Sequence, residues 1–305
     1  MRRTPQPWLR MILWIALLLP GAARGQKPPD GVTDEQRQAT EQAIPATAPA
    51  RPAKARRLLV VDLNVGRPGH RSIPHANLAV RLMGERTGAY ETTVCHDRSM
   101  LAPERLARFD AVFLNNTLGP IFHTPALRQG FAAYISGGGG LVANHAVTVT
   151  STDWPAFGEI LGARGAAHRD ADEKVTVKLD DPDSPLTAMF DRGGFTIADE
   201  IFRFHEPYSR RRVHVLLSVD TDRTDMTQGG RPRGRCVRPD NDYPVSWIRR
   251  HGKGRVFYCS LGHNPHVFRD GRMLQHFLAG IQFALGDLEA DATPSAHSPA
   301  TPPAD

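Results

Sequence analysis

A run of four glycines at residues 137–140 leads directly into a short apolar segment, residues 141–143. Glycine is poor inside regular elements, so the run marks a turn. The apolar segment is too short for a helix and lies between turn residues, which predicts a buried strand. That strand ends on two hydrogen-bonding side chains, Asn144 and His145. Because ligands bind at the carboxyl ends of central strands in open α/β sheets, these two residues mark a first candidate site.

The chain before this strand alternates between apolar runs and helical patterns. Continuous apolar runs predict buried parallel strands, and apolar residues spaced three and four apart predict the helices between them. The predicted strands are 57–64, 91–96 and 110–116, and the predicted helices are 75–88, 101–108 and 124–136. With the strand after the glycines, this order predicts a doubly wound, mostly parallel α/β sheet with right-handed crossovers.

The second half of the chain shows a different pattern. Its strands are shorter and follow one another without regular helices between them, which favours an added antiparallel region in the same domain. The predicted strands are 174–179, 200–204, 213–219, 245–249 and 255–261, and the predicted helices are 154–161 and 273–285. The last helix carries apolar residues on one face and ends at Gly286, a common helix terminator.

Residues 1–25 have the features of a signal peptide. Basic residues, among them Arg2 and Arg3, precede an apolar run at 11–19 that is too short to span a bilayer. We expect cleavage before Gln26 and export to the periplasm or the extracellular space. An uncleaved N-terminal anchor is the alternative.

The two segments outside the apolar pattern lack a hydrophobic period. Residues 26–55 are rich in Pro, Ala, Gln and Thr, which predicts a disordered linker with room for a short helix near residues 33–42. Residues 289–305 have the same character and predict a disordered tail. The folded domain is therefore expected to span residues 56–288.

The charge pattern argues against a nucleic-acid partner. The net charge is +6, but the basic residues are scattered among acids, and clusters such as residues 210–212 lack neighbouring aromatic residues. A nucleic-acid site would concentrate these charges in a stripe. We expect a small polar ligand such as a carbohydrate, with no nucleic-acid partner and no membrane contact once the signal peptide is removed.

The chain has three cysteines, Cys95, Cys236 and Cys259. An exported protein can form a disulfide, and Cys236 with Cys259 is the pair we favour, although sequence cannot place the two within bonding distance. Cys95 lies in a strand-like run and is expected to be a small buried hydrophobe.

Polar side chains follow the predicted strands where each one ends. Because the carboxyl ends of parallel strands meet at one edge of a sheet, these loops are expected to form a shared pocket. The candidate substrate-binding residues in them are Ser72, His75, Asn115, Asn144 and His266.

Three imidazoles and one carboxylate form the candidate catalytic set. They are His70, His145, Glu200 and His263. These are acid and base groups, and they are also ligands that a divalent metal ion such as zinc uses, so the same four residues are the candidate metal ligands. No HExxH or CxxC spacing requires a metal, and loop residues that hydrogen-bond the backbone are the other interpretation.

Two better-known site types are disfavoured. Residues 66–70 (GRPGH) resemble a phosphate-binding turn, but Pro68 lacks an amide donor and the GxGxxG spacing is missing. His145 occupies the strand-to-loop position where many α/β enzymes carry a nucleophile, and no Ser or Cys is found there.

Several stretches together resemble the ThuA-like (trehalose utilisation) family, which is related to class I glutamine amidotransferases. The resemblance covers about residues 58–285. It is carried by residues 69–74 (GHRSIP), 138–145 (GGGLVANH), 199–202 (DEIF), 244–247 (PVSW) and 252–263 (GKGRVFYCSLGH). The resemblance implies a flavodoxin-like sheet, a role in carbohydrate metabolism and loss of the amidotransferase cysteine. The matching motif positions are His70, His145, Glu200 and His263.

Three functions follow as hypotheses. The first is an exported hydrolase, isomerase or lyase that acts on a sugar or sugar derivative, with or without a divalent metal. The second is a non-catalytic carbohydrate-binding or scaffold protein. The third is an amidotransferase-like hydrolase that uses Cys259 or Cys95 as its nucleophile.

Overall fold

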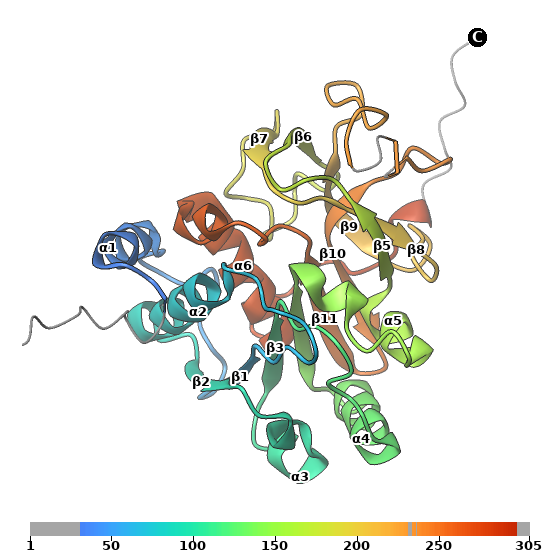
Figure 1. Ribbon diagram of the computed structural model, residues 1–305. Coiled ribbons are helices and arrows are strands. Elements are labelled where there is room, and N and C mark those ends of the chain that lie inside the picture. Colours follow the sequence, from blue (N-terminus) through green and yellow to red (C-terminus); the bar gives the residue numbers. More distant parts are fainter. Residues whose placement is uncertain (1–30, 231–233, 236, 298–305) are drawn as a thin grey trace, which may run out of the picture.

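The computed structural model describes residues 31–230, 234–235 and 237–297. The predicted signal peptide and Cys236 lie outside the described residues. Within the described part, nine strands form one mixed sheet in the order β2-β1-β3-β4-β11-β10-β9-β6-β7, and β5 and β8 form a separate pair (Figure 1). No helix in these residues is long and apolar enough to cross a membrane.

The parallel half of the sheet consists of five strands that pair side by side. They are β1 (Arg57–Val61), β2 (Glu91–Cys95), β3 (Ala111–Asn115), β4 (Gly140–Asn144) and β11 (Gly254–Cys259). β1, β3 and β4 are apolar runs that are buried almost throughout, as central parallel strands require, whereas β2 (ETTVC) lies at the edge of the sheet and is only partly buried. The predicted doubly wound α/β fold is confirmed, and β11 joins its parallel part from the far end of the chain.

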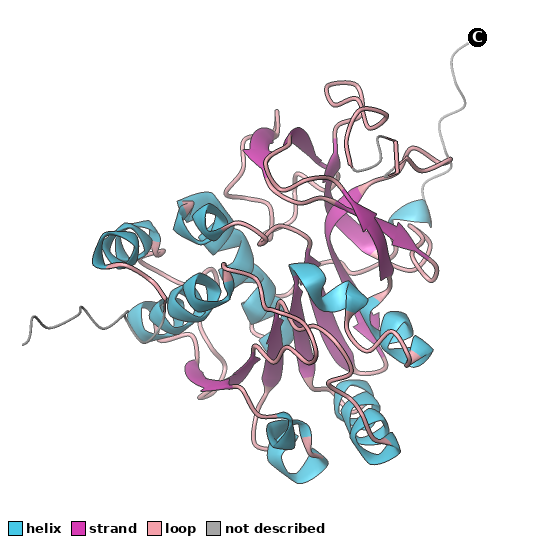
Figure 2. Ribbon diagram, viewed as in Figure 1, coloured by secondary structure: helices cyan, strands magenta, loops and turns pink. Residues whose placement is uncertain are grey.

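Helices cover both faces of this parallel core (Figure 2). Alternate residues of each strand point to opposite faces: Leu58 and Val60 lie in one hydrophobic cluster, and Leu59 and Val61 in the other. The first cluster includes α2 (Ile73–Thr87) and α6 (Gly271–Leu285). The second includes residues of the helices on the opposite face, which are α3 (Pro103–Leu106), α4 (Pro125–Ser136) and α5 (Pro155–Leu161).

The antiparallel extension continues the same sheet beyond β11. It is formed by β10 (Pro244–His251), β9 (His214–Val219), β6 (Lys174–Leu179) and β7 (Phe195–Ala198). The separate pair is β5 (Arg164–His168) with β8 (Phe202–His205). The sequence pattern missed β5 and β7, and the strand expected at 200–204 begins two residues later, so Glu200 lies in the connection between β7 and β8.

The segment after residue 30 is packed, which differs from the disordered linker expected there. The expected short helix is α1 (Asp34–Ala43), with a capping box at Thr33, and Val32 and Ile44 are buried. The Gln282 side chain accepts a hydrogen bond from Ala50 N at 2.9 Å and donates one to Ala50 O at 2.6 Å. Two long-range hydrogen bonds and apolar burial therefore order a stretch whose composition alone suggested flexibility.

The C-terminal tail also differs from its expected disorder as far as residue 297. The backbone N–H of Ser295 donates to Val213 O at 3.1 Å, and Ala296 N–H donates to Arg210 O at 3.0 Å. A short 3₁₀ turn, η4 (Ser295–His297), ends the described chain. The compositional argument failed here because these contacts are made with the loop before β9, which is far away in sequence.

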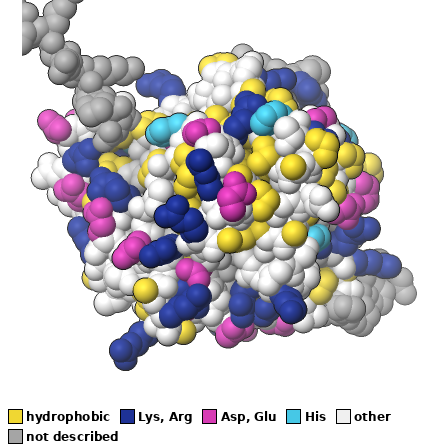
Figure 3. Space-filling model, turned by 90° about the horizontal axis from the view of Figure 1, so that it is seen from below, with side chains coloured by type: hydrophobic (Ala, Val, Ile, Leu, Met, Phe, Trp, Pro, Cys, Tyr) yellow, Lys and Arg dark blue, Asp and Glu magenta, His cyan; other side chains and the backbone are white. Residues whose placement is uncertain are grey.

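The described cysteines are unpaired. Cys259 is a fully buried free thiol in β11, and Cys95 is a half-buried free thiol at the end of β2. Cys236, the expected partner of Cys259, lies outside the described residues. Basic and acidic side chains lie interspersed on the surface seen in Figure 3, in keeping with a chain that does not present a basic stripe there.

Candidate functional site

The four candidate catalytic residues come together from separate connections of the sheet. His70 lies between β1 and α2, His145 follows β4, Glu200 lies between β7 and β8, and His263 follows β11. The ring centroid of His70 lies 5.0 Å from that of His145 and 5.0 Å from that of His263. The structure thus brings all four side chains into one cluster at the carboxyl ends of the parallel strands, as the order of the strands implies.

His145 has a strained backbone and a fixed ring. It begins the 3₁₀ turn η2 (His145–Val149) with φ of 52°, the left-handed region that non-glycine residues seldom adopt. Its side chain is fully buried, and Nδ1 lies 2.6 Å from Ser260 O. A carbonyl oxygen only accepts, so Nδ1 carries the proton of this hydrogen bond and Nε2 faces the cluster. The sharp turn after the strand is thus present, with an imidazole where a nucleophile would stand.

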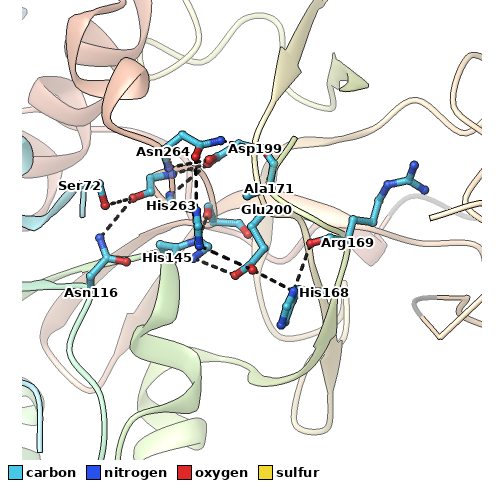
Figure 4. A network of polar contacts seen from close by, with 12 residues as sticks. Ser72, Asn116, His145, His168, Arg169, Ala171, Asp199, Glu200, His263 and Asn264 are labelled. Atoms are coloured by element: carbon cyan, nitrogen blue, oxygen red, sulfur yellow. Dashed lines mark hydrogen bonds and ion pairs between the residues drawn. The ribbon is translucent and has the colours of Figure 1, made fainter. Parts of the chain in front are cut away.

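Glu200 is the centre of the cluster (Figure 4). One carboxylate oxygen, Oε2, lies 3.2 Å from His145 Nε2, and the other, Oε1, lies 2.9 Å from His168 Nδ1 and 3.8 Å from His263 Nε2. Burial alone would raise the pKa of Glu200, but hydrogen bonding and charge interactions with His145 and His168 outweigh burial and hold the pKa well below its usual range. The side chain is therefore a carboxylate at neutral pH.

His70 is held as a neutral imidazole. Burial, followed by the nearby His145 and His263, lowers the pKa of His70 to about 3. Within the described chain neither ring nitrogen makes a hydrogen bond, and Nδ1 is buried without a partner. A neutral ring with an unpaired nitrogen can accept a proton, donate a hydrogen bond or bind a metal ion.

Asp199 holds the backbone of the loop that carries His263. Its carboxylate accepts hydrogen bonds from the backbone N–H groups of Gly262 at 2.6 Å, His263 at 3.3 Å and Asn264 at 2.8 Å. Asp199 is fully buried, and burial raises its pKa despite these donors. The two adjacent carboxylates therefore have different partners. Asp199 binds the backbone of the loop after β11, and Glu200 contacts the imidazoles.

His168 belongs to the site and was missed in the sequence. Its Nδ1 lies 2.9 Å from Glu200 Oε1 and 3.1 Å from Arg169 O. The hydrogen bond with Glu200 raises the pKa of His168, although burial opposes the shift. His168 is the last residue of β5 and pairs with Phe202 of β8, two residues after Glu200. Recognising β5 would have placed it there, but its sequence, RGAAH, shows no strand alternation.

The predicted substrate-binding residues occupy different settings, and none of them lines the pocket that contains Glu200. Ser72 Oγ donates to Gly262 O at 2.6 Å, Asn115 Nδ2 to Ile73 O at 3.0 Å, and Asn144 Nδ2 to Leu261 O at 2.8 Å. These three side chains are fully buried and hold the loops together. His75 is buried in α2, with Nδ1 unpaired and its pKa lowered to about 4 by burial, and His266 is exposed.

A pocket of about 750 Å³ opens beside the cluster. His70, His168 and Glu200 line it, together with the aromatic ring of Phe202 and the charged side chain of Arg67. The pocket therefore offers a polar wall of ionisable groups and an apolar wall, at a volume typical of small-molecule sites. His145 and His263 are not among its lining residues, but both lie beside Glu200 and His70, which are.

Three of the candidate metal ligands fit one ion. Ligand atoms of His70, Glu200 and His263 all lie within 4.8 Å of one another. His145 is not part of this set, because its Nε2 faces the Oε2 side of Glu200. The donors are two imidazoles and a carboxylate, a combination that transition metals use in open catalytic sites.

Comparison with solved structures supports the fold. A ThuA-like protein from Bacteroides uniformis ATCC 8492 matches with a TM-score of 0.59 and 23% sequence identity, over 77% of this chain and 94% of that one. A ThuA-like protein from Parabacteroides merdae ATCC 43184 matches with a TM-score of 0.53 and 14% identity, over 78% of this chain and 93% of that one. No curated protein matches the chain.

Sequence comparison identifies the family. The family profile described as "ThuA: Trehalose utilisation" matches residues 57–284, which contain all four candidate catalytic residues and the whole mixed sheet. This chain belongs to the ThuA (trehalose utilisation) family.

Proposed function

We propose that the protein binds a sugar or sugar derivative in the pocket beside Glu200 and transforms it by proton transfer. The observation that carries this proposal is the pairing of Glu200 Oε1 with His168 Nδ1 at 2.9 Å, on the wall of a pocket of about 750 Å³. A carboxylate that holds one nitrogen of an imidazole orients the ring and leaves the other nitrogen for the substrate. The reaction class is hydrolysis, isomerisation or elimination.

The walls of the pocket suit the two faces of a sugar ring. Phe202 and Val149 offer apolar surface for C–H groups, and Arg67, Asp153 and Thr152 offer polar groups for hydroxyls. His70 also lines the pocket, where its neutral ring is suited to polarising a carbonyl or hydroxyl oxygen. A small polar molecule with one apolar face therefore fits better than a nucleotide or a lipid.

The roles of the cluster differ from one residue to the next. His168, with its side chain 46% exposed, is the group that we assign to proton transfer. Glu200 orients His168. The buried ring of His145 lies on the other side of the carboxylate, with Nε2 3.2 Å from Glu200 Oε2. Cys259 takes no part in this scheme, because its side chain is fully buried in β11.

The test is a screen of keto-sugars and disaccharides, followed by NMR of the reaction products. A converted sugar should lose at least about 100-fold in kcat with His168→Asn and with Glu200→Gln, since a positioned acid or base contributes about that much. His123→Asn, which alters an exposed imidazole, is the matched control. Full turnover by both site variants would end the proposal. Binding of a sugar without turnover by the wild type would instead favour the carbohydrate-binding alternative.

Export forms the second part of the proposal and rests on residues 1–25 alone. The mature protein should begin at Gln26 and be recovered from the periplasm or the medium. N-terminal sequencing of the protein purified from its native host tests this, and an intact residue 1 in the cytoplasmic fraction would contradict it.

A further inference from the structure

Two imidazoles and one carboxylate converge on a common point beside the pocket. The ligand atoms of His70, Glu200 and His263 lie within 4.8 Å of one another. Three atoms bound to one ion at about 2.1 Å lie roughly 3.3 Å apart in a tetrahedral arrangement. The required approach is on the order of 1 Å per side chain, which is within reach of small side-chain rotations.

The imidazole nitrogens of this set have few protein partners. Within the described residues His70 makes no hydrogen bond, although its Nδ1 is buried. His263 Nδ1 has only a long contact of 3.4 Å with Asn264 Oδ1, and its Nε2 faces Glu200. A buried polar atom without a partner is costly, and an ion bound to His70 would give this ring the partner that it lacks.

Two imidazoles outside this set contact the carboxylate of Glu200, one at each oxygen. His145 Nδ1 is tied to Ser260 O at 2.6 Å, which orients the ring so that Nε2 faces Glu200 Oε2 at 3.2 Å. His145 Nε2 nevertheless makes no well-aligned hydrogen bond. His168 contacts Oε1 at 2.9 Å. Groups that orient a ligating carboxylate in this way are a regular feature of metal sites.

We propose that His70, His263 and Glu200 bind one divalent transition-metal ion, while His145 and His168 orient the carboxylate. Such a set leaves coordination positions open, and His70 and Glu200 direct them toward the pocket because both residues line it. Two nitrogen ligands favour Zn²⁺, Co²⁺ or Fe²⁺ over Mg²⁺ and Ca²⁺, which prefer oxygen. The inference lies at the same site as the proposed sugar chemistry but depends on none of its steps.

The experiment measures metal binding without any substrate. The full mature protein is stripped with a chelator and titrated with Co²⁺, followed by its visible absorption, and then with Zn²⁺ in competition. We expect one equivalent of Co²⁺ that Zn²⁺ displaces. His70→Ala and His263→Ala should each lower the affinity by at least about 100-fold, and His168→Gln by about 10-fold, as expected for a group that only orients a ligand.

The controls separate this inference from a general loss of structure. His123→Ala removes an exposed imidazole and should keep wild-type affinity. Glu200→Gln has the size of the native side chain and loses only the anionic ligand, so it covers the case in which an alanine variant fails to fold. The proposal would be overturned if the wild type bound no Co²⁺. It would also be overturned if His70→Ala, His263→Ala and Glu200→Gln all bound Co²⁺ with wild-type affinity. Metal binding without sugar turnover would leave it standing and count against the proposed function.

Discussion

The carboxylate of Asp199 accepts a hydrogen bond of 2.6 Å from the backbone N–H of Gly262. This contact joins the connection between β7 and β8 to the loop after β11, two segments more than sixty residues apart. Gly262 has φ of 142°, and a Cβ there would lie 2.5 Å from Asn144 Nδ2, so the loop can approach β4 only as glycine. The position of His263 therefore depends on Asp199 and on the absence of a side chain at Gly262.

The first prediction concerns this joint. Asp199→Ala leaves the backbone N–H groups of Gly262, His263 and Asn264 without their acceptor, and the carboxylate site is fully buried. We expect the free energy of unfolding to fall by roughly 3 kcal/mol, since each unpaired buried donor costs about 1–3 kcal/mol and the loop can partly relax. Urea unfolding measures the change.

A nearby acid supplies the control for this prediction. Asp172 is exposed and makes none of these contacts, so Asp172→Ala should alter the free energy of unfolding by less than about 0.5 kcal/mol. If Asp199→Ala were equally mild, the loop after β11 would be held by something other than this carboxylate.

The second prediction concerns Cys259 as a nucleophile. Burial raises the pKa of its thiol well above the usual range, so almost no thiolate exists at neutral pH. Iodoacetamide should leave Cys259 unlabelled in the native protein and label it in urea, as read by peptide mass spectrometry. Cys259→Ser should also retain any sugar turnover. Rapid native labelling of Cys259 with loss of turnover would revive the thiol-hydrolase hypothesis.

The third prediction is a dependence of stability on pH through His276. Its ring is fully buried, with Nδ1 2.6 Å from Leu186 O and Nε2 2.9 Å from Ser246 Oγ, and burial lowers its pKa to about 4 from 6.5. Between these values the unfolded chain binds the proton and the folded chain does not, so stability falls as the pH falls. From about pH 7.5 to about pH 5 this residue alone should remove about 2 kcal/mol.

The measurement compares unfolding free energies of the wild type and His276→Gln at the two pH values. The variant should lose less stability than the wild type on acidification, by about 2 kcal/mol, while His123→Gln, at an exposed site, should behave like the wild type. Equal losses in all three proteins would show that His276 is not the group responsible.

The centre of the parallel core was predictable because β1, β3 and β4 are short apolar runs bounded by turn residues. The strand 57–64 was expected three residues too long, since Asp62, Leu63 and Asn64 extend the run into the loop. β5 was not predictable in this way, because glycine and alanine occupy its centre and its pairing with β8 is what makes it a strand. Because β5 was not predicted, His168 at its end was not included in the expected site.

The expected cluster of His70, His145, Glu200 and His263 followed from one geometric rule and one resemblance. Parallel strands present their carboxyl ends at one edge, which places the loops after β1, β4 and β11 together. The different roles of the individual residues in the cluster could not be predicted from the sequence. It depends on which oxygen of Glu200 faces which ring, and on the tie between His145 and Ser260.

The last prediction concerns the segment that composition assigned to a flexible linker. Gln282 is fully buried in α6 and makes two hydrogen bonds with the backbone of Ala50, as donor and as acceptor. Gln282→Ala removes these bonds and opens a small cavity, so the stretch after α1 should detach more often from the domain. We expect faster proteolysis between residues 44 and 55 and a loss of about 2 kcal/mol in the free energy of unfolding. Gln38→Ala, an exposed change in α1, should produce neither effect. Wild-type resistance to proteolysis in Gln282→Ala would mean that the buried side chains of Val32 and Ile44 hold this segment without the hydrogen bonds.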